Sequence, residues 1–288
     1  MIAVLKHELR NYFHTLTAYV FGAVLLVAVG IGSMLYNIEA AVSNFEYVLS
    51  VGSLAFVIIV PLLTMRVIAE ERKQKTDQLL YSLPISTSQV VLGKYLALLL
   101  VYLIPLCIVF VYPFIFSQYG DVYLLTSYGS LMAFFIMGAA LIAIGVFISS
   151  LTENQGFAAG IGVAIILFNY FSVRLSEYVS STALGTSIAL FVIIIALVTL
   201  MEHLTKSTNF AYGIGFVLFL AVLAVIFFDQ TKLEGLLPEI MTKLSLFERF
   251  HSFVNGVFDM TAIVYYMTII VFFLFLSVQS LIISRNPE

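Results

Sequence analysis

Long apolar runs recur along the chain and constrain its fold more than any other feature. A helix needs about 20 consecutive, mostly apolar residues to cross the hydrocarbon core of a bilayer. About eight stretches approach or reach this length. They span residues 17–36, 48–67, 95–116, 127–151, 156–173, 184–201, 210–228 and 263–283. Because the fifth and sixth stretches are the shortest, alternatives with six or seven spans stay open.

The composition indicates that a bilayer is the solvent for this chain. Of its 288 residues, 62% are hydrophobic and only 10% are charged, with a mean hydropathy of +1.10. Soluble domains contain about 45–50% apolar and about 25% charged residues. The small net charge of −3 argues against nucleic acid as a partner. The sequence therefore predicts an all-α polytopic membrane protein, with residues 1–288 forming a single transmembrane domain.

The distribution of basic residues predicts the orientation. Loops rich in Lys and Arg stay in the cytoplasm. With eight spans both termini lie on one side, and the loops on that side contain most of the basic residues. The exceptions are Arg174, Lys232, Lys243 and Arg249. We expect a multi-pass protein of the cell membrane with both termini in the cytoplasm.

Two segments outside the spans show helical periodicity. Residues 1–16 predict a short amphipathic helix at the inner interface, with Lys6, Glu8 and Arg10 away from its apolar face. The alternative is a simple extension of the first span. Residues 229–262 predict a long extracellular loop that contains an amphipathic helix.

The densest run of charge lies in the loop between the second and third spans. The pattern predicts a cytoplasmic helix over residues 69–83, which stops because Pro84 disfavours helical geometry at Leu83. A second helix is expected to follow at once, since Ser86 and Gln89 fit a capping box.

The first helix of this loop has a charged base and an apolar tip. Leu79, Leu80 and Leu83 at the tip are exposed to the cytoplasm unless another surface covers them. Two interpretations stay open: the tip docks another protein, or it packs beneath the bundle. On the second helix, Lys94 is expected to extend its ammonium group to the membrane interface.

The segment EERKQKTDQLLYSLPISTSQVVLGKYLA resembles the loop after the second span in permease subunits of type II (ABC-2 type) ABC exporters. The matching positions are Glu70, Glu71, Arg72, Thr76, Leu79, Leu80, Leu83, Pro84, Gly93 and Lys94. Lys75 stands where the family usually has glycine. The C-terminal segment FERFHSFVNGVFDM is similar to the gliding-motility-type branch of these permeases.

The resemblance implies a half-transporter. Two copies, or two related chains, would form the pathway as a dimer, and each would dock a separate ATP-binding subunit through the cytoplasmic loop. The docking positions implied are Glu70, Glu71, Arg72, Thr76, Leu79, Leu80, Leu83 and Pro84. ATP and Mg²⁺ would be bound by that partner and no cofactor by this chain, and substrate would move outward.

The fifth span carries a second expectation from the resemblance. In the family the first and fifth spans line the pathway between protomers, which implies a dimer or pathway role for Gly156, Gly160, Asn169 and Tyr170. A GxxxG pattern such as Gly156–Gly160 is typical of close helix contacts in lipid. Ordinary packing within the chain is the alternative.

The residues themselves predict no catalytic or metal site. The Gly-Lys pair at the start of the third span is followed by Tyr95, where a P-loop requires Ser or Thr. A membrane-protease interpretation fails because the predicted topology separates Glu70 from His251, and the four histidines are widely spaced. Alternatives of other classes are an ion-coupled secondary transporter and a non-transporting scaffold or sensor subunit. The transported substrate is not predicted.

Overall fold

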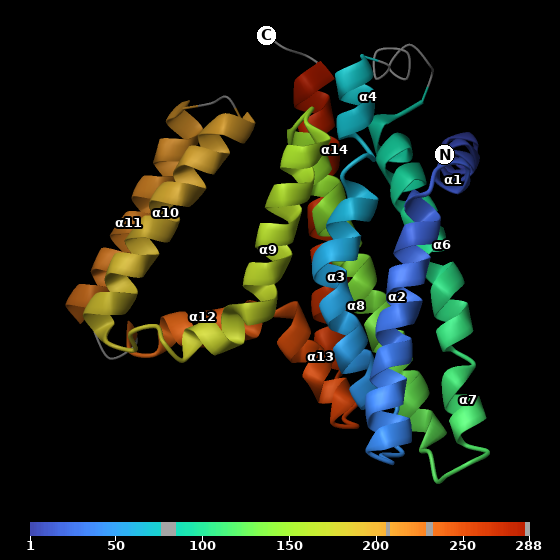
Figure 1. Ribbon diagram of the computed structural model, residues 1–288. Coiled ribbons are helices and arrows are strands. Elements are labelled where there is room, and N and C mark those ends of the chain that lie inside the picture. The colour runs from blue at the N-terminus through green and yellow to red at the C-terminus, as the bar shows by residue number, and fades with distance from the viewer. Residues whose placement is uncertain (76–84, 206–207, 229–232, 286–288) are drawn as a thin grey trace. The chain divides into compact units, whose positions relative to one another are not determined.

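A computed structural model describes residues 1–75, 85–205, 208–228 and 233–285 (Figure 1). Helices make up the regular structure of these four ranges, and no strand occurs in them. The all-α prediction is therefore confirmed.

Six helical segments of the described chain are long and apolar enough to cross a membrane. They are Thr17–Glu39, Glu46–Gln74, Thr87–Phe116, Leu124–Leu151, Gln155–Ser176 and Met260–Ser284. Two more apolar helices, α10 (Ala183–Thr205) and α11 (Thr208–Phe228), coincide with the predicted sixth and seventh spans, although their apolar parts are shorter. The polytopic architecture is confirmed, and a total of eight spans stays a prediction.

The chain forms two compact units. The first comprises Met1–Tyr170 and Arg249–Glu288, and the second comprises Phe171–Glu248. The single domain expected for residues 1–288 stays a prediction. The helices outside the second unit, or shared with it, are α1 (Ile2–His14), α2 (Thr17–Ser33), η1 (Met34–Glu39), α3 (Glu46–Thr64), α4 (Ala69–Gln74), α6 (Thr87–Val109), α7 (Tyr112–Phe116), α8 (Leu124–Leu151), α9 (Gln155–Ser176), α13 (Leu246–Val254) and α14 (Met260–Arg285).

Helix α8 is the centre of the first unit, and α3 and α14 pack along it while α2 packs on α3 (Figure 1). Two glycines of α8 allow the close approach of its neighbours. A Cβ at Gly145 would overlap the side chain of Thr64 on α3, and one at Gly138 would lie 2.6 Å from the hydroxyl oxygen of Tyr102 on α6. These contacts fix the spacing of α3, α6 and α8.

The predicted cytoplasmic helix over residues 69–83 is wrong at Lys75. Helix α4 begins at Ala69 as expected but ends at Gln74, because Lys75 adopts the left-handed conformation (φ 56°) that terminates helices. Lys75 occupies the position where the resembling family has glycine, the residue that adopts this conformation without strain. The docking positions Thr76, Leu79, Leu80, Leu83 and Pro84 lie outside the described residues.

The start of α6 agrees with the prediction. Ser86 is the N-cap, and its Oγ accepts the backbone N–H of Gln89 at 3.3 Å. This is the first half of the expected capping box, and it orients the chain as it enters the third span.

The helix predicted within residues 229–262 is present as two short helices, α12 (Leu236–Leu244) and α13. On α13 the aromatic side chains of Phe247, Phe250 and Phe253 are buried, whereas His251 is exposed, so this helix is amphipathic. The extracellular location of the segment stays a prediction.

In the second unit, α10 and α11 lie side by side (Figure 1). Ile194 and Val198 of α10 form a small core with Phe191 and Val222. This hairpin is held mainly by apolar contacts.

Candidate functional site

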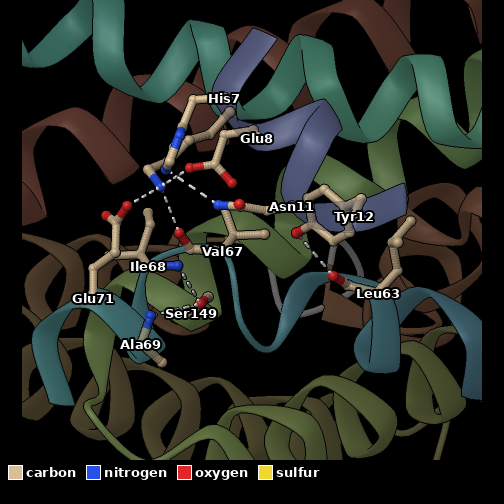
Figure 2. Close-up of polar contacts among 11 residues, drawn as sticks. His7, Glu8, Asn11, Tyr12, Leu63, Val67, Ile68, Ala69, Glu71 and Ser149 are labelled. Atoms are coloured by element: carbon tan, nitrogen blue, oxygen red, sulfur yellow. Dashed lines mark hydrogen bonds and ion pairs between the residues drawn. The ribbon is translucent and has the colours of Figure 1, made fainter. Parts of the chain in front are cut away.

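Lys94 lies inside the protein, so the expected extension of its ammonium group to a membrane interface is wrong. Its side chain is 1% exposed. The Nζ atom lies 2.6 Å from Oε1 of Glu8 and 2.6 Å from Oε1 of Glu71, and it donates to the carbonyl of Val67 at 3.0 Å. Figure 2 labels the three partners, Glu8, Val67 and Glu71, and marks these contacts with dashed lines. All three donors of the ammonium are satisfied, which is what a buried charge requires.

Helix α1 supplies the first carboxylate. Val4, Glu8 and Tyr12 are its buried residues, one turn apart on one face. The expected position of Glu8 away from the packed face is therefore wrong. A Cβ at Gly93 would lie 3.1 Å from the Cβ of Val4, so glycine at this position admits α1 against α6. The Gly-Lys pair of the family motif is the place where α1 packs in this structure.

Tyr12 continues this contact toward α3. Its hydroxyl donates to the carbonyl of Leu63 at 3.3 Å (Figure 2). Burial raises the pKa of the Tyr12 phenol well above its usual value, and the carboxylates of Glu8, Glu70 and Glu71 raise the pKa further. The phenol therefore stays protonated and keeps its role as a donor at physiological pH.

Helix α4 is held at its first turn by a side chain of α8. Ser149 Oγ accepts the N–H groups of Ile68 and Ala69, both at 3.2 Å, and donates to the carbonyl of Met65 at 3.2 Å. The α4 N-cap residue, Ile68, has no side-chain cap of its own. Ser149 thus replaces the usual N-cap serine from a different helix.

Two further side-chain contacts connect α4 to α6 and α14. Glu71 binds Lys94, and Arg72 Nη2 donates to Ser284 Oγ at 2.7 Å. Ser280, one turn earlier on α14, donates to the carbonyl of Ser150 at 3.0 Å. Side-chain contacts therefore link one short helix to three long apolar helices.

A cavity of about 570 Å³ lies beside this cluster. The residues that line it are Ala3, Val4, His7, Glu8, Asn11, Arg66, Val67, Glu70, Glu71, Gln74, Ile85 and Lys94. His7 Nε2 and Asn11 Nδ2 lie 3.2 Å apart at its edge (Figure 2). Five of its twelve lining residues are charged, whereas charged residues make up only 10% of the chain.

The docking residues predicted on α4 make contacts within the chain. Glu71 and Arg72 bind Lys94 and Ser284, and Glu70 accepts a hydrogen bond from Gln74 at 3.4 Å. Lys73 and Gln74 are the exposed side chains of this helix. A docking role for the predicted set stays a prediction.

The predicted pathway residues lie on α9 and do not line the cavity. Gly156 donates its N–H to Asn154 Oδ1 at 2.9 Å, and a Cβ at Gly160 would meet nothing within 4 Å. Packing of α9 against α3 uses Gly162 instead, where a Cβ would lie 3.0 Å from Pro61. Asn169 and Tyr170 are half-buried and make contacts with other groups. Their role in a pathway stays a prediction.

Four residues of the site were not predicted from the sequence: Glu8, Tyr12, Val67 and Ser149. The spacing of Val4, Glu8 and Tyr12 is the signal that could have placed Glu8 on the packed face. Nothing in the sequence marks Ser149, whose partner Ala69 is 80 residues away. Among the described residues, no group of three or more His, Cys, Asp or Glu side chains could hold a metal ion.

A comparison with known protein families shows to which family the chain belongs. The model of ABC-2 family transporter proteins matches residues 27–183, more than half of the chain. The protein belongs to the ABC-2 transporter family. It is therefore an ABC transporter permease, a transmembrane component that is not itself catalytic, and such membrane domains generally work with an ATP-binding subunit. No curated protein and no solved structure matches this ABC-2 permease significantly, and the gliding-motility-type branch is not confirmed.

Proposed function

We propose that this ABC-2 permease is an exporter subunit that docks a separate ATP-binding subunit through the loop from α4 to α6. Two permease copies, or two related chains, form the pathway in the cell membrane. The observation that carries this proposal is the connection of α4 to three helices, through Lys94 of α6, Ser149 of α8 and Ser284 of α14. A force on α4 reaches the bundle through these contacts.

The ionic cluster makes this connection stiff. Separating Glu71 from Lys94 would remove one of the two carboxylates that bind a buried ammonium group, and a hydrogen bond to a charged group contributes about 1.5–3 kcal/mol. Moving α4, α1 and the start of α6 together avoids this cost. When the ATP-binding subunits close, we expect these three helices to move as one body and to tilt the third span.

The proposed orientation places the cluster in the cytoplasm with both termini. Lys73 and Gln74, the exposed residues of α4, then face the ATP-binding subunit together with Leu79, Leu80, Leu83 and Pro84. ATP and Mg²⁺ are bound by that subunit. The excess of basic residues in the loops on this side supports the orientation.

We assign the dimer contact to the exposed face of α9. Gly156 and Gly160 are exposed, and no neighbour within the described chain uses the space above Gly160. Close helix contacts in lipid favour such small residues. Asn169 and Tyr170, further along α9, are the polar groups that we expect beside the pathway.

A pull-down tests the docking proposal. The permease is purified in gentle detergent from its native host, beside a variant in which Leu79, Leu80 and Leu83 are changed to Asp. A matched control carries Asp at the exposed apolar residues Val257, Phe258 and Met260. We expect an ATP-binding protein with the native chain and the control, and its loss with the loop variant. An ATP-binding protein retained by a folded loop variant, or absent from the native chain after crosslinking, would contradict the proposal.

One observation favours the alternative of an ion-coupled carrier. Glu46 is 2% exposed, and its Oε2 has no hydrogen-bond partner among the described residues. Its position at the first residue of α3 places it at the end of a span, away from mid-depth. Transport by the reconstituted complex that follows an ion gradient without ATP would support this alternative, and transport that requires ATP hydrolysis would support the exporter. A scaffold would show neither.

A further inference from the structure

An apolar groove of about 280 Å³ lies between α2 and α3, next to the charged cavity. Its walls include Val20, Val24, Ile58 and Leu62, which are 39–59% exposed on the surface of the chain. Arg66 is the charged residue of its lining, and it also lines the cavity beside Lys94. The groove and the polar cavity therefore meet at one guanidinium group.

The length of the groove matches one leaflet of a bilayer. Ala55 and Met65 line opposite ends of the groove, and the segment between them rises about 15 Å at about 1.5 Å per residue. The hydrocarbon core of a bilayer is about 30 Å thick, so one leaflet occupies about half of it. Arg66 follows Met65 directly and so lies where a lipid headgroup meets its acyl chains.

The Nε atom of Arg66 has no hydrogen-bond partner among the described residues. The residue is half-buried, and its Nε is buried without a hydrogen bond. A guanidinium cannot lose its charge in a protein, and its planar fork matches the oxygens of a phosphate. An anionic group with at least two oxygens would satisfy it.

Glu70 supplies the complementary charge in the same cavity. Lys94 is shared by Glu8 and Glu71, whereas the hydrogen bond of the Glu70 carboxylate comes from Gln74 at 3.4 Å. Arg66 and Glu70 thus offer one cation and one anion to a ligand. A phosphate alone would satisfy only the first, and a headgroup with a phosphate and a primary amine would satisfy both.

We propose that this groove binds one aminophospholipid, such as phosphatidylethanolamine, from the leaflet that contacts α1 and α4. One acyl chain lies along Val20, Val24, Ile58 and Leu62. The phosphate binds Arg66, and the ammonium group binds Glu70. The site needs no ATP-binding subunit, so its test is independent of the exporter proposal.

Native mass spectrometry of the purified full chain tests this site. The permease is incubated with equal amounts of phosphatidylethanolamine, phosphatidylcholine and phosphatidylglycerol. We expect one bound phosphatidylethanolamine, favoured about tenfold over phosphatidylcholine, the factor of one charge-assisted hydrogen bond. Arg66→Gln should lower its binding about tenfold, while Arg66→Lys retains part of it. Glu70→Gln should reduce phosphatidylethanolamine to the level of phosphatidylcholine.

Two further variants keep the test decisive if Arg66→Gln fails to fold. Ile58→Trp fills the groove and should reduce the binding of all three lipids. Val264→Trp is the matched control, because it lies in a larger apolar depression of about 640 Å³ on α14 whose lining holds no charged residue. It should leave lipid binding unchanged.

Three results would overturn the proposal. Equal binding of the three lipids would show an apolar groove without headgroup recognition. Unchanged phosphatidylethanolamine binding in folded Arg66→Gln and Ile58→Trp variants would show that the lipid binds elsewhere. A dimer that dissociates with Ile58→Trp while lipid binding is unaffected would identify the occupant as a second copy of the chain.

Discussion

Carboxylates that accept hydrogen bonds lie near both ends of α3, and the two sets have different partners. At the end next to α4, Glu8 and Glu71 share the ammonium group of Lys94. At the other end, Glu46 accepts a hydrogen bond from Ser127 at 3.0 Å, and its second oxygen has no partner in the described part of the chain. At the first end an ammonium group neutralises the carboxylates, whereas at the second end one hydroxyl group is the hydrogen-bond donor to the carboxylate.

The two ends differ in their polar contacts because they join different kinds of helices. The cluster joins α1, α4 and α6, two of which are short helices with little apolar surface to bury. Glu46 and Ser127 join α3 to α8, which already pack along their lengths. At this end Ser130 also donates to the carbonyl of Phe253 at 2.9 Å, and Phe134 packs against Phe250. The comparison indicates that charged side chains join the two short helices to the bundle, whereas apolar packing joins the long helices to one another.

Lys94→Met should have the largest effect on stability, because it removes the ammonium group of the ionic cluster. The buried carboxylate of Glu8 and the partly buried carboxylate of Glu71 would lose their cation, so we expect a loss of about 3–5 kcal/mol in the free energy of unfolding. Thermal melting in detergent measures it. Lys73→Met, at an exposed lysine of α4, is the control and should melt like the native chain. Adding Glu8→Gln and Glu71→Gln to Lys94→Met should recover much of the loss, and a native melting curve for Lys94→Met alone would contradict the account.

A paired substitution compares the ends directly. Glu8→Gln weakens a charge-assisted hydrogen bond and should cost about 1.5–3 kcal/mol. Glu46→Gln keeps an oxygen for the hydroxyl of Ser127 and should cost less than about 1 kcal/mol. The melting temperatures of the two variants show which substitution costs more stability, and we expect the lower melting temperature for Glu8→Gln. The opposite order would mean that Glu46 carries the more important charge.

Ser149→Ala tests the capping of α4 by α8. Loss of an N-cap side chain costs about 1 kcal/mol, and here it should act locally. Hydrogen exchange of the backbone from Ile68 to Gln74 should accelerate. Ser150→Ala is the control because its hydroxyl donates within α8, to Phe147. Equal exchange in the two variants would show that Ser149 does not hold α4.

Lys75→Gly should raise the stability of the protein rather than lower it, and we expect the smallest effect from this substitution. A residue with a side chain pays about 1–2 kcal/mol for the left-handed conformation, which glycine adopts freely. We expect a gain of up to about 1 kcal/mol in stability, offset in part by the flexibility of glycine in the unfolded chain. Lys73→Gly, inside α4, should instead lose up to about 1 kcal/mol. A loss in both variants would contradict the assigned conformation of Lys75.

The elements that were predictable depend on local sequence. Apolar length predicted the six long apolar helices, and Ser86 with Gln89 predicted the start of α6. The ionic cluster depends on contacts that local sequence does not contain, since Glu8 and Lys94 are 86 residues apart. A lysine near the end of an apolar run is typical of interface extension, and only the packing of α1 shows that this one is buried. The end of α4 at Gln74 was not predicted, although the family glycine at the position of Lys75 is a signal for it.

We propose that the α4 end of the bundle contacts the ATP-binding subunit, and crosslinking tests this contact most directly. A photo-crosslinking amino acid placed at Lys73, on α4, or at Tyr123, which is 77% exposed at the start of α8, tests it in the native host. We expect a crosslinked ATP-binding protein from Lys73 and none from Tyr123. An ATP-binding protein captured from Tyr123, or none from Lys73 when Tyr123 and Lys73 variants are equally expressed, would contradict it.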